Sequence, residues 1–314
     1  MAAHGAAVRR GGIQTERRGE AIAGYSFIAV PITLFLILNI GAIVFALYIS
    51  FWNWTAIGPQ GFVGVANYNR LLTDRVFHTG ILNTIYYTAF VVPLQMALGL
   101  LLAVIVNQKI RGQTFFRAAF YFPAIASSAA ITVLWIFLLQ PNGLFNGLRQ
   151  AFPFPGLFAA LGFPGDWNWL GRSETSLEAI MALNIWTTSG TMMLFYLASL
   201  QTISREIYEA AAIDGASAWQ AFWRITFPLL KPGHYFVATV SVIGALQVFD
   251  QAYIGGGSGG DPNYSLMTIV LYLYNAAFRQ FQPGYAAAVG IVLFVIIFSA
   301  TLIQRRLFGS APSW

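Results

Sequence analysis

The chain has 314 residues, of which 57% are hydrophobic and only 9% are charged. A soluble domain is about a quarter charged, so this composition excludes an ordinary soluble domain and a disordered chain. The absence of cysteine excludes thiol catalysis, iron–sulfur clusters and cysteine zinc sites. The net charge of +6 comes from basic residues scattered between long apolar runs, whereas nucleic-acid binding needs them gathered on one face. We therefore expect an all-α integral membrane protein that binds no nucleic acid.

Six apolar segments are long enough to cross a lipid bilayer, which takes about 20 helical residues. They are 22–51, 81–106, 118–140, 179–203, 233–254 and 284–304. The first follows a basic stretch, as in a signal peptide, but its apolar part is too long for one, so we expect an uncleaved span. The expected organisation is a tail at 1–21, a six-span transmembrane domain at 22–309 and a tail at 310–314.

The distribution of Lys and Arg predicts the orientation. If the N-terminus lies inside, the inner segments hold 12 of these residues and the outer segments hold 5. Because short cytoplasmic loops are enriched in Lys and Arg, we expect a multi-pass protein of the cytoplasmic membrane with both termini in the cytoplasm.

Residues 141–175, predicted outside, are rich in proline, glycine and aromatic residues. An aromatic belt at the membrane surface is the favoured interpretation, and docking of an external partner is the alternative. The aromatic residues are Phe145, Phe152, Phe154, Phe158, Phe163, Trp167 and Trp169.

A second outer segment, 264–278, is charge-free but too short to span. Leu266, Ile269, Val270 and Leu273 have the spacing of one helix face. This spacing predicts an amphipathic helix lying at the outer surface. The glycine-rich run 255–260 before it predicts a flexible turn.

The inventory of chemical groups argues against catalysis by this chain. Its two lysines, Lys109 and Lys231, do not follow glycine, so the nucleotide-binding motif GxxxxGK[ST] is absent. His4, His78 and His234 are predicted in different compartments, and no GxSxG nucleophile elbow occurs. We expect no catalytic residue, no metal site and no cofactor in this chain, so that another chain supplies the energy.

Residues 204–232, predicted on the cytoplasmic side and here called the coupling loop, carry the strongest local signals. Ser204 is suited to cap a helix, with Glu206 near its positive end. Gly215 stands where a helix end needs a left-handed residue. The pattern predicts a first helix of about ten residues, too short to be stable alone in water.

A second helix is predicted directly after this turn. Ser217 and Gln220 have the spacing of a capping box. Pro228 and Pro232 are expected to limit the continuation of this helix. The coupling loop is therefore predicted to be a helix–turn–helix.

The same loop carries a longer pattern. Glu-Ala-Ala at 209–211 is followed by three residues, Gly215, nine residues and Ile-Thr-Phe-Pro at 225–228. This resembles the EAA signature of permeases from binding-protein-dependent ABC importers, with Phe227 in place of the usual leucine. The fuller pattern YEAAAIDGA, with PLLKP at 228–232, is similar to the carbohydrate-uptake group, which includes the maltose and glycerol-3-phosphate permeases.

The resemblance implies a set of partners. A second permease subunit of similar fold would pair with this chain in the lipid bilayer. The coupling loop would enter a groove of a cytoplasmic ATPase dimer, which binds the ATP and magnesium, and an extracytoplasmic sugar-binding protein would deliver the sugar. The residues expected to contact the ATPase are Glu209, Ala210, Ala211, Asp214 and Gly215.

Polar groups inside spans four and five indicate a substrate pathway, because such groups are costly in a membrane. Sugars are bound by amides, carboxylates and aromatic faces, and by the resemblance cavity-lining residues occur in these two spans. Hydrogen bonding between helices is the alternative role, and Asp250 could instead cap its helix or pair with Arg279. The candidates are Asn184, Trp186, Thr187, Thr188, Thr191, Ser241, Gly244, Ala245, Gln247, Val248 and Asp250; weaker ones in span two are Asn83, Tyr86, Tyr87 and Gln95.

The predicted function is the permease subunit of a sugar ABC importer. An ion-driven secondary transporter is the first rival, although it would more typically show buried paired acids or discontinuous helices in repeated halves. A membrane-embedded enzyme would need a catalytic cluster. An ABC importer for another solute also remains open, but no arginine lies in the middle of a span to meet a phosphate.

Overall fold

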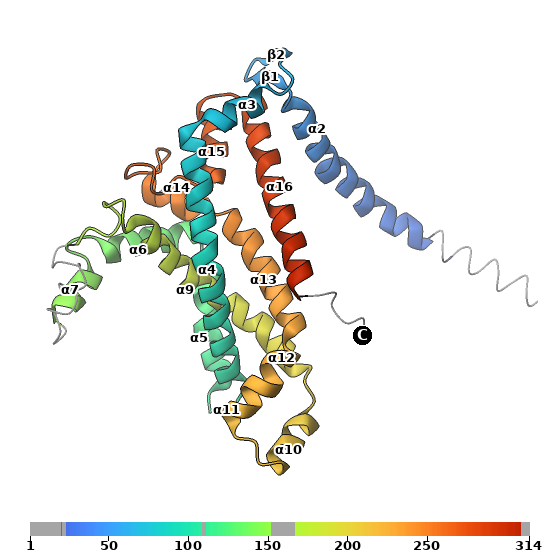
Figure 1. Ribbon diagram of the computed structural model, residues 1–314, viewed down its shortest axis with the longest axis vertical. Coiled ribbons are helices and arrows are strands. Elements are labelled where there is room, and N and C mark those ends of the chain that lie inside the picture. The colour runs from blue at the N-terminus through green and yellow to red at the C-terminus, as the bar shows by residue number, and fades with distance from the viewer. Residues whose placement is uncertain (1–19, 21–22, 109–110, 152–166, 309–314) are drawn as a thin grey trace, which may run out of the picture.

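The computed structural model describes residues 20, 23–108, 111–151 and 167–308. Within them, five helices are long and apolar enough to cross a membrane, and a sixth crossing is made if one bent helix pair counts as a span. The helices form an elongated bundle with the coupling loop at one end and a β-hairpin at the other (Figure 1). The expectation of an all-α membrane protein is confirmed.

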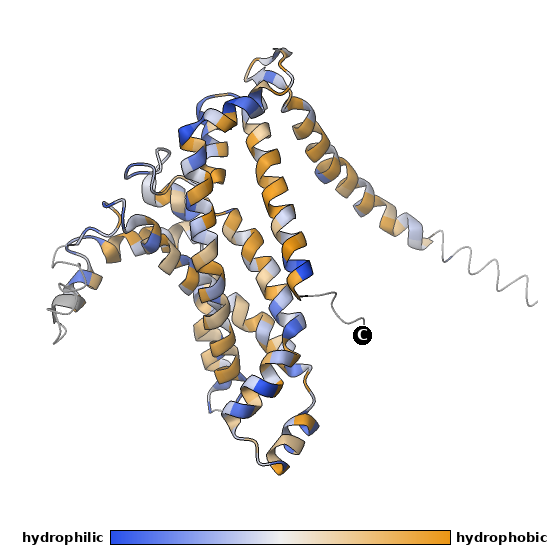
Figure 2. Cartoon of the chain, in the orientation of Figure 1, coloured by the Kyte–Doolittle hydropathy of each residue, from blue (hydrophilic) through white to orange (hydrophobic). Residues whose placement is uncertain are grey.

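The first span, Ala23–Ile49, contacts α16 (Pro283–Phe308) near its C-terminal end and diverges from the bundle toward its N-terminal end (Figure 1). It includes a π-helical turn, η1 (Leu36–Gly41), and ends in α2 (Ala42–Ile49). Its most apolar stretch has no buried residue, and apolar residues follow its whole length (Figure 2). This surface therefore needs an apolar neighbour, either lipid or protein.

A short antiparallel hairpin follows, formed by β1 (Trp52–Thr55) and β2 (Gly58–Phe62), with Trp52 opposite Phe62. Helix α3 (Ala66–Thr73) leads from it into the second span.

The second span, α4 (Arg75–Asn107), packs beside the fourth, α9 (Ser176–Gln201), in a parallel arrangement. Tyr86 donates to Glu178 and, further along both helices, Gln95 accepts from Thr188. Because the two helices run in the same direction, the chain between them must return across the membrane. The bent pair therefore makes the sixth crossing.

That crossing is not the single helix expected at 118–140. It consists of α5 (Gln113–Ile125) and α6 (Ser128–Leu139), which are bent by 94° at the residues between them. Pro123 removes one backbone donor from α5, and the serines at 127 and 128 are of the type that favours helix starts.

Helix α7 (Leu144–Ala151) follows, in the outer segment predicted to be aromatic. Phe145 packs edge-on against Trp169, and the Arg172 guanidinium lies 4.1 Å from the centre of the Trp167 ring. The predictions for Phe152, Phe154, Phe158 and Phe163 fall outside the described residues.

The remaining elements run from the coupling loop to the last span. They are α10 (Arg205–Ile213), α11 (Ala218–Ala221), η2 (Phe222–Thr226), α12 (Phe227–Leu229), α13 (Lys231–Leu246), α14 (Asp250–Gly256), α15 (Ile269–Tyr274), η3 (Asn275–Arg279) and α16 (Pro283–Phe308). Helix α13 runs antiparallel to α9, since His234 contacts Tyr196 and Ser241 contacts Met192.

The prediction of a surface helix at 264–278 is wrong in its placement. Leu266 precedes α15, and both Leu266 and Ile269 are fully buried in the main apolar core. The Asn83 amide donates to three carbonyls of the preceding loop, those of Tyr264, Ser265 and Met267. The segment packs into the bundle because its apolar face meets protein instead of the membrane surface.

Candidate functional site

The first helix of the coupling loop, α10, is fixed at both ends by local hydrogen bonds. The Ser204 hydroxyl accepts from the Glu206 amide at 3.2 Å. At the other end Gly215 has φ +76°, and the amides of Gly215 and Ala216 donate to the carbonyls of Ala212 and Ala211. This pair of bonds is a Schellman motif, which needs a left-handed residue at the glycine position. Both predicted helix ends are confirmed.

The second helix begins with the predicted capping box, in which Ser217 and Gln220 bond each other's backbone amides at 3.3 and 2.9 Å. The expectation that Pro228 and Pro232 limit this helix is confirmed, although the helix continues through Pro228 itself. In the π turn η2, backbone amides bond carbonyls five residues earlier instead of four. The helix can therefore continue through Pro228, which has no amide hydrogen to donate. The break comes at Leu230, between the two prolines.

The predicted ATPase contacts lie at the free end of the bundle (Figure 1). Four of them are exposed, whereas Ala211 is buried. Two large apolar side chains are exposed on the same loop, Ile213 at 87% and Trp219 at 71%. A hydrogen bond of 2.9 Å between the hydroxyls of Tyr208 and Thr226 ties α10 to η2. The loop is therefore a braced projection with exposed apolar side chains, the kind of surface that marks protein contacts.

A cavity of about 320 Å³ lies among α4, α9, α13 and the start of α14. It contains most of the predicted pathway residues, and Gln95, one of the weaker candidates, also lines it. Its lining residues are Gln95, Asn184, Thr188, Met192, Val240, Ser241, Gly244, Ala245, Gln247, Val248, Phe249, Asp250 and Gln251.

The polar groups of this cavity differ in how far they are already satisfied. The Thr188 hydroxyl donates to the buried Gln95 amide oxygen at 2.6 Å, and the Ser241 hydroxyl contacts the Met192 sulfur at 3.4 Å. The Asn184 side chain forms no hydrogen bond within the described part of the chain. Its amide is therefore available to a ligand, as the alternating donors and acceptors of a sugar require.

The cavity ends where the fifth span breaks between α13 and α14. The residues at this break, Gln247 to Phe249, are non-helical, and Asp250 opens α14. A carboxylate in the first turn of a helix is stabilised by the helix dipole. The alternative role of Asp250, pairing with Arg279, is not supported, because the two residues line different cavities.

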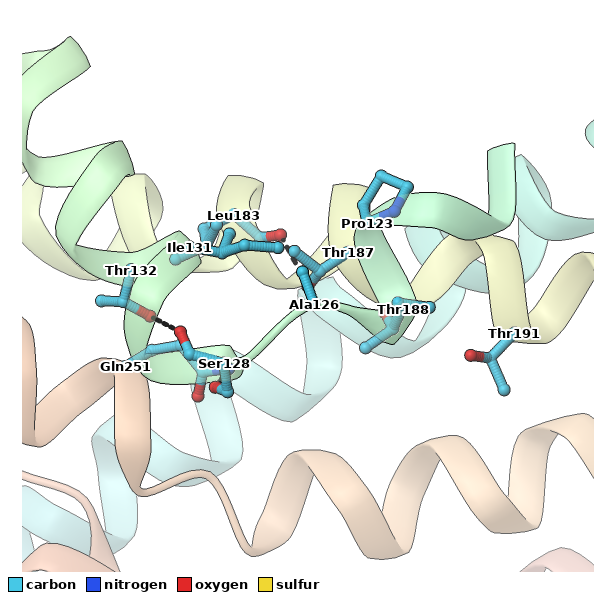
Figure 3. A pocket seen from close by; sticks show the side chains of 11 residues that line it. Pro123, Ala126, Ser128, Ile131, Thr132, Leu183, Thr187, Thr188, Thr191 and Gln251 are labelled. Carbon is cyan, nitrogen blue, oxygen red and sulfur yellow. Dashed lines mark hydrogen bonds between the residues drawn. The ribbon is translucent and has the colours of Figure 1, made fainter. Parts of the chain in front are cut away.

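A second, smaller cavity of about 160 Å³ lies beside the bend between α5 and α6 (Figure 3). Thr187 and Thr191 line this cavity instead of the larger one, and Thr188 and Gln251 line both. The Gln251 amide donates to the Ser128 hydroxyl at 3.1 Å, which joins α14 to α6.

Two residues illustrate where the sequence-based site differs from the cavities. Trp186 lines neither of them, because its indole stacks on Trp135 with ring centres 5.9 Å apart. Gln251 was missed, although an amide next to Asp250 near the end of an apolar span was a usable signal.

Solved structures define the class of this fold. The chain superposes on the crystal structure of a bacterial ABC transporter involved in the import of the acidic polysaccharide alginate, with a TM-score of 0.76 at 22% identity. The match covers 93% of this chain and 98% of that one. A structure of a bacterial alginate ABC transporter in complex with its alginate pentasaccharide-bound periplasmic protein gives the same TM-score at 21% identity, covering 94% and 98%. The chain thus has the same fold as a chain of these ABC transporters.

The sequence relatives make the assignment specific. The multiple sugar-binding transport system permease protein MsmF of Streptococcus mutans is 33% identical, covering 90% of this chain and 94% of that protein. The trehalose/maltose transport system permease protein MalF of Thermococcus litoralis is also 33% identical, covering 91% and 94%.

Residues 95–309 match the family described as the binding-protein-dependent transport system inner membrane component. The chain belongs to this family. It is therefore a multi-pass inner-membrane permease of a binding-protein-dependent ABC importer, as the coupling-loop motif predicted.

Proposed function

We propose that the cargo of this permease is a neutral sugar. Sugar transport appears in the names of several relatives at 33% identity, and the larger cavity has the matching chemistry. Asparagine, glutamine, serine and threonine line it, and Asp250 is the one ionisable residue among its lining residues. An anionic cargo would need a cationic group, which these lining residues do not provide.

ATP hydrolysis is assigned to a separate cytoplasmic ATPase dimer, which binds the ATP and magnesium, and this chain is proposed to carry no catalytic site. The observation that carries this proposal is the braced coupling loop with Ile213 and Trp219 exposed. Exposed apolar anchors at a rigid end are suited to enter a groove of a partner. Glu209 and Asp214, also exposed, would offer charge partners at the rim.

A second permease subunit is proposed to complete the pathway. The larger cavity is partly open, and this chain lines it with α4, α9, α13 and the start of α14. Most of the first span diverges from the bundle, and its most apolar stretch is uncovered (Figure 1). Both features fit a paired assembly in which each chain supplies half of the pathway.

The proposed orientation places the coupling loop and both termini in the cytoplasm and the β-hairpin outside. Arg305 and Arg306 lie in the last turn of α16, whose C-terminal end points away from the hairpin and toward the coupling-loop end (Figure 1), and this agrees with the assignment. An extracytoplasmic sugar-binding protein would then dock at the hairpin end.

Reconstitution of the purified complex into liposomes tests these assignments. The tagged chain is extracted gently from its host, and its partners are identified by mass spectrometry. We expect a second permease and an ATPase to co-purify, and uptake of a radiolabelled sugar to require ATP and the binding protein. Uptake by the chain alone, driven by an ion gradient without ATP, would contradict the proposal and favour the secondary transporter, for which the two broken spans are also suited.

A further inference from the structure

A buried histidine on α13 lies where the coupling loop meets α9 and α13, two of the helices that line the larger cavity. His234 is in the first turn of α13 and is 8% exposed. Its Nδ1 lies 3.0 Å from the Tyr196 hydroxyl oxygen on α9, and its Nε2 lies 3.2 Å from the Phe227 carbonyl oxygen on α12. One imidazole ring therefore joins α13, which carries it, to both α9 and α12.

The two partners fix the hydrogen-bonding roles of the ring. A carbonyl oxygen only accepts, so Nε2 must carry the hydrogen and donate to Phe227. In the neutral ring Nδ1 is then an acceptor, and the Tyr196 hydroxyl donates to it. This arrangement is directional and uses both nitrogens.

The position of this ring relates the loop to the cavity. Phe227 directly follows η2, and η2 is joined to α10 by the hydrogen bond between the hydroxyls of Thr226 and Tyr208. On the other side, Ser241 lies seven residues after His234 on α13, a rise of about 10 Å, and it lines the larger cavity. On α9, Thr188 lies eight residues before Tyr196 and also lines the larger cavity. The ring thus lies about two helical turns from the polar wall of the cavity.

Helices α9 and α13 approach each other closely beside the histidine. A side-chain carbon added at Gly233 would lie 2.6 Å from the Ser199 hydroxyl oxygen and 2.8 Å from its Cβ. The Phe227 ring lies 4.5 Å from the His234 ring, centre to centre. The close approach at Gly233 puts α13 in direct contact with α9 beside the histidine.

We propose that His234 is a positioning residue that transmits movement of the coupling loop to the α9 and α13 walls of the sugar cavity. The Nε2 bond connects the ring to the loop, and the Nδ1 bond connects it to α9. This inference rests on the ATP-driven transport proposed above. It predicts that the two bonds are needed for coupling, and not only for folding.

Separate variants remove one bond at a time. In His234→Asn the amide reaches the position of Nδ1 and retains the Tyr196 contact but loses the Phe227 contact. In His234→Gln the amide nitrogen reaches the position of Nε2 and retains only the Phe227 contact. Tyr196→Phe removes the α9 bond without changing the histidine. Tyr235→Phe is the matched control, since this hydroxyl on the next residue forms no hydrogen bond within the described residues.

Each variant is purified with its partner subunits and reconstituted, and both sugar import and ATP hydrolysis are measured. We expect a fall of about fivefold or more in sugar molecules imported per ATP for the three link variants, with basal ATP hydrolysis and complex yield retained and the Tyr235→Phe variant unchanged. An unchanged ratio in assembled link variants overturns the proposal. Loss of assembly in all three variants also overturns it, because the histidine is then only structural. If the wild-type complex itself imports without ATP, the proposed function fails instead.

Discussion

Gly215 gives the sharpest test of the coupling loop, because its cost of substitution can be worked from the backbone alone. Its φ of +76° is unfavourable for residues with a side chain, and a Cβ added there would meet nothing within 4 Å. The penalty is therefore purely conformational, about 1–2 kcal/mol for alanine, larger for valine and smaller for asparagine. A penalty of this size shifts the equilibrium between the closed turn and an opened one by about 5- to 30-fold.

We expect Gly215→Val to lower sugar import per ATP hydrolysed, Gly215→Ala to lower it less, and Gly215→Asn to retain most of it. The assay is the reconstituted complex with both activities measured in the same liposomes. Gly112→Ala is the matched control, because Gly112 has φ +79° and an added Cβ meets only the Phe116 ring, at 4.0 Å. Normal coupling in the assembled Gly215→Val complex, or an equal loss in Gly112→Ala, would refute the role of this turn.

Two further predictions concern the cavity and the outer end of the bundle. Asn184→Ala should lower uptake at limiting sugar by about tenfold through loss of a hydrogen bond to the cargo, with complex yield unchanged; normal uptake would remove Asn184 from the site. Burial by itself raises the pKa of the Asp74 carboxyl, but the hydrogen bond from Tyr272, backbone amides and the charge of Arg70 outweigh it, so the pKa is lowered from 3.8. The stabilisation from Asp74 should therefore be fully present above pH 3.8 and lost as the pH falls through the lowered pKa. Thermal unfolding of the complex across this range should show the loss, and an equal acid-side loss in Asp74→Asn would contradict it.

The local features of the coupling loop were predictable from the sequence because each depends on residues within a few positions. The Ser204 cap, the Gly215 turn and the Ser217–Gln220 box all join a side chain or amide to nearby backbone. Such bonds form in any environment that allows the helix to start or stop there. The span positions were predictable for a similar reason, because the hydropathy that identifies a span depends only on consecutive residues of one helix.

The breaks and the burial of 264–278 were not predictable in this way. Hydropathy shows that a surface is apolar but not whether lipid or protein covers it, so the burial of Ile269 was missed. The 94° bend after Pro123 and the break before Asp250 depend on how α6 and α14 pack against the rest of the bundle. The same limit applies to Trp186, whose stacking partner Trp135 lies on another span.

One hydrogen bond joins α6 and α14, the helices that follow these two breaks, and it leads to a last prediction. Gln251 lines both cavities and donates to Ser128, so α14 and α6 are joined at the point where the cavities adjoin. A sugar that passes from one cavity toward the other must break this contact.

The chain contains no cysteine, so the double variant Ser128→Cys with Gln251→Cys places thiols in this subunit only at the contact. We expect oxidation to a disulfide to stop import and reduction to restore it, whereas each single variant should be insensitive to the oxidant. Full import by the oxidised double variant would show that the two helices need not separate, and the pathway would then have to avoid Gln251.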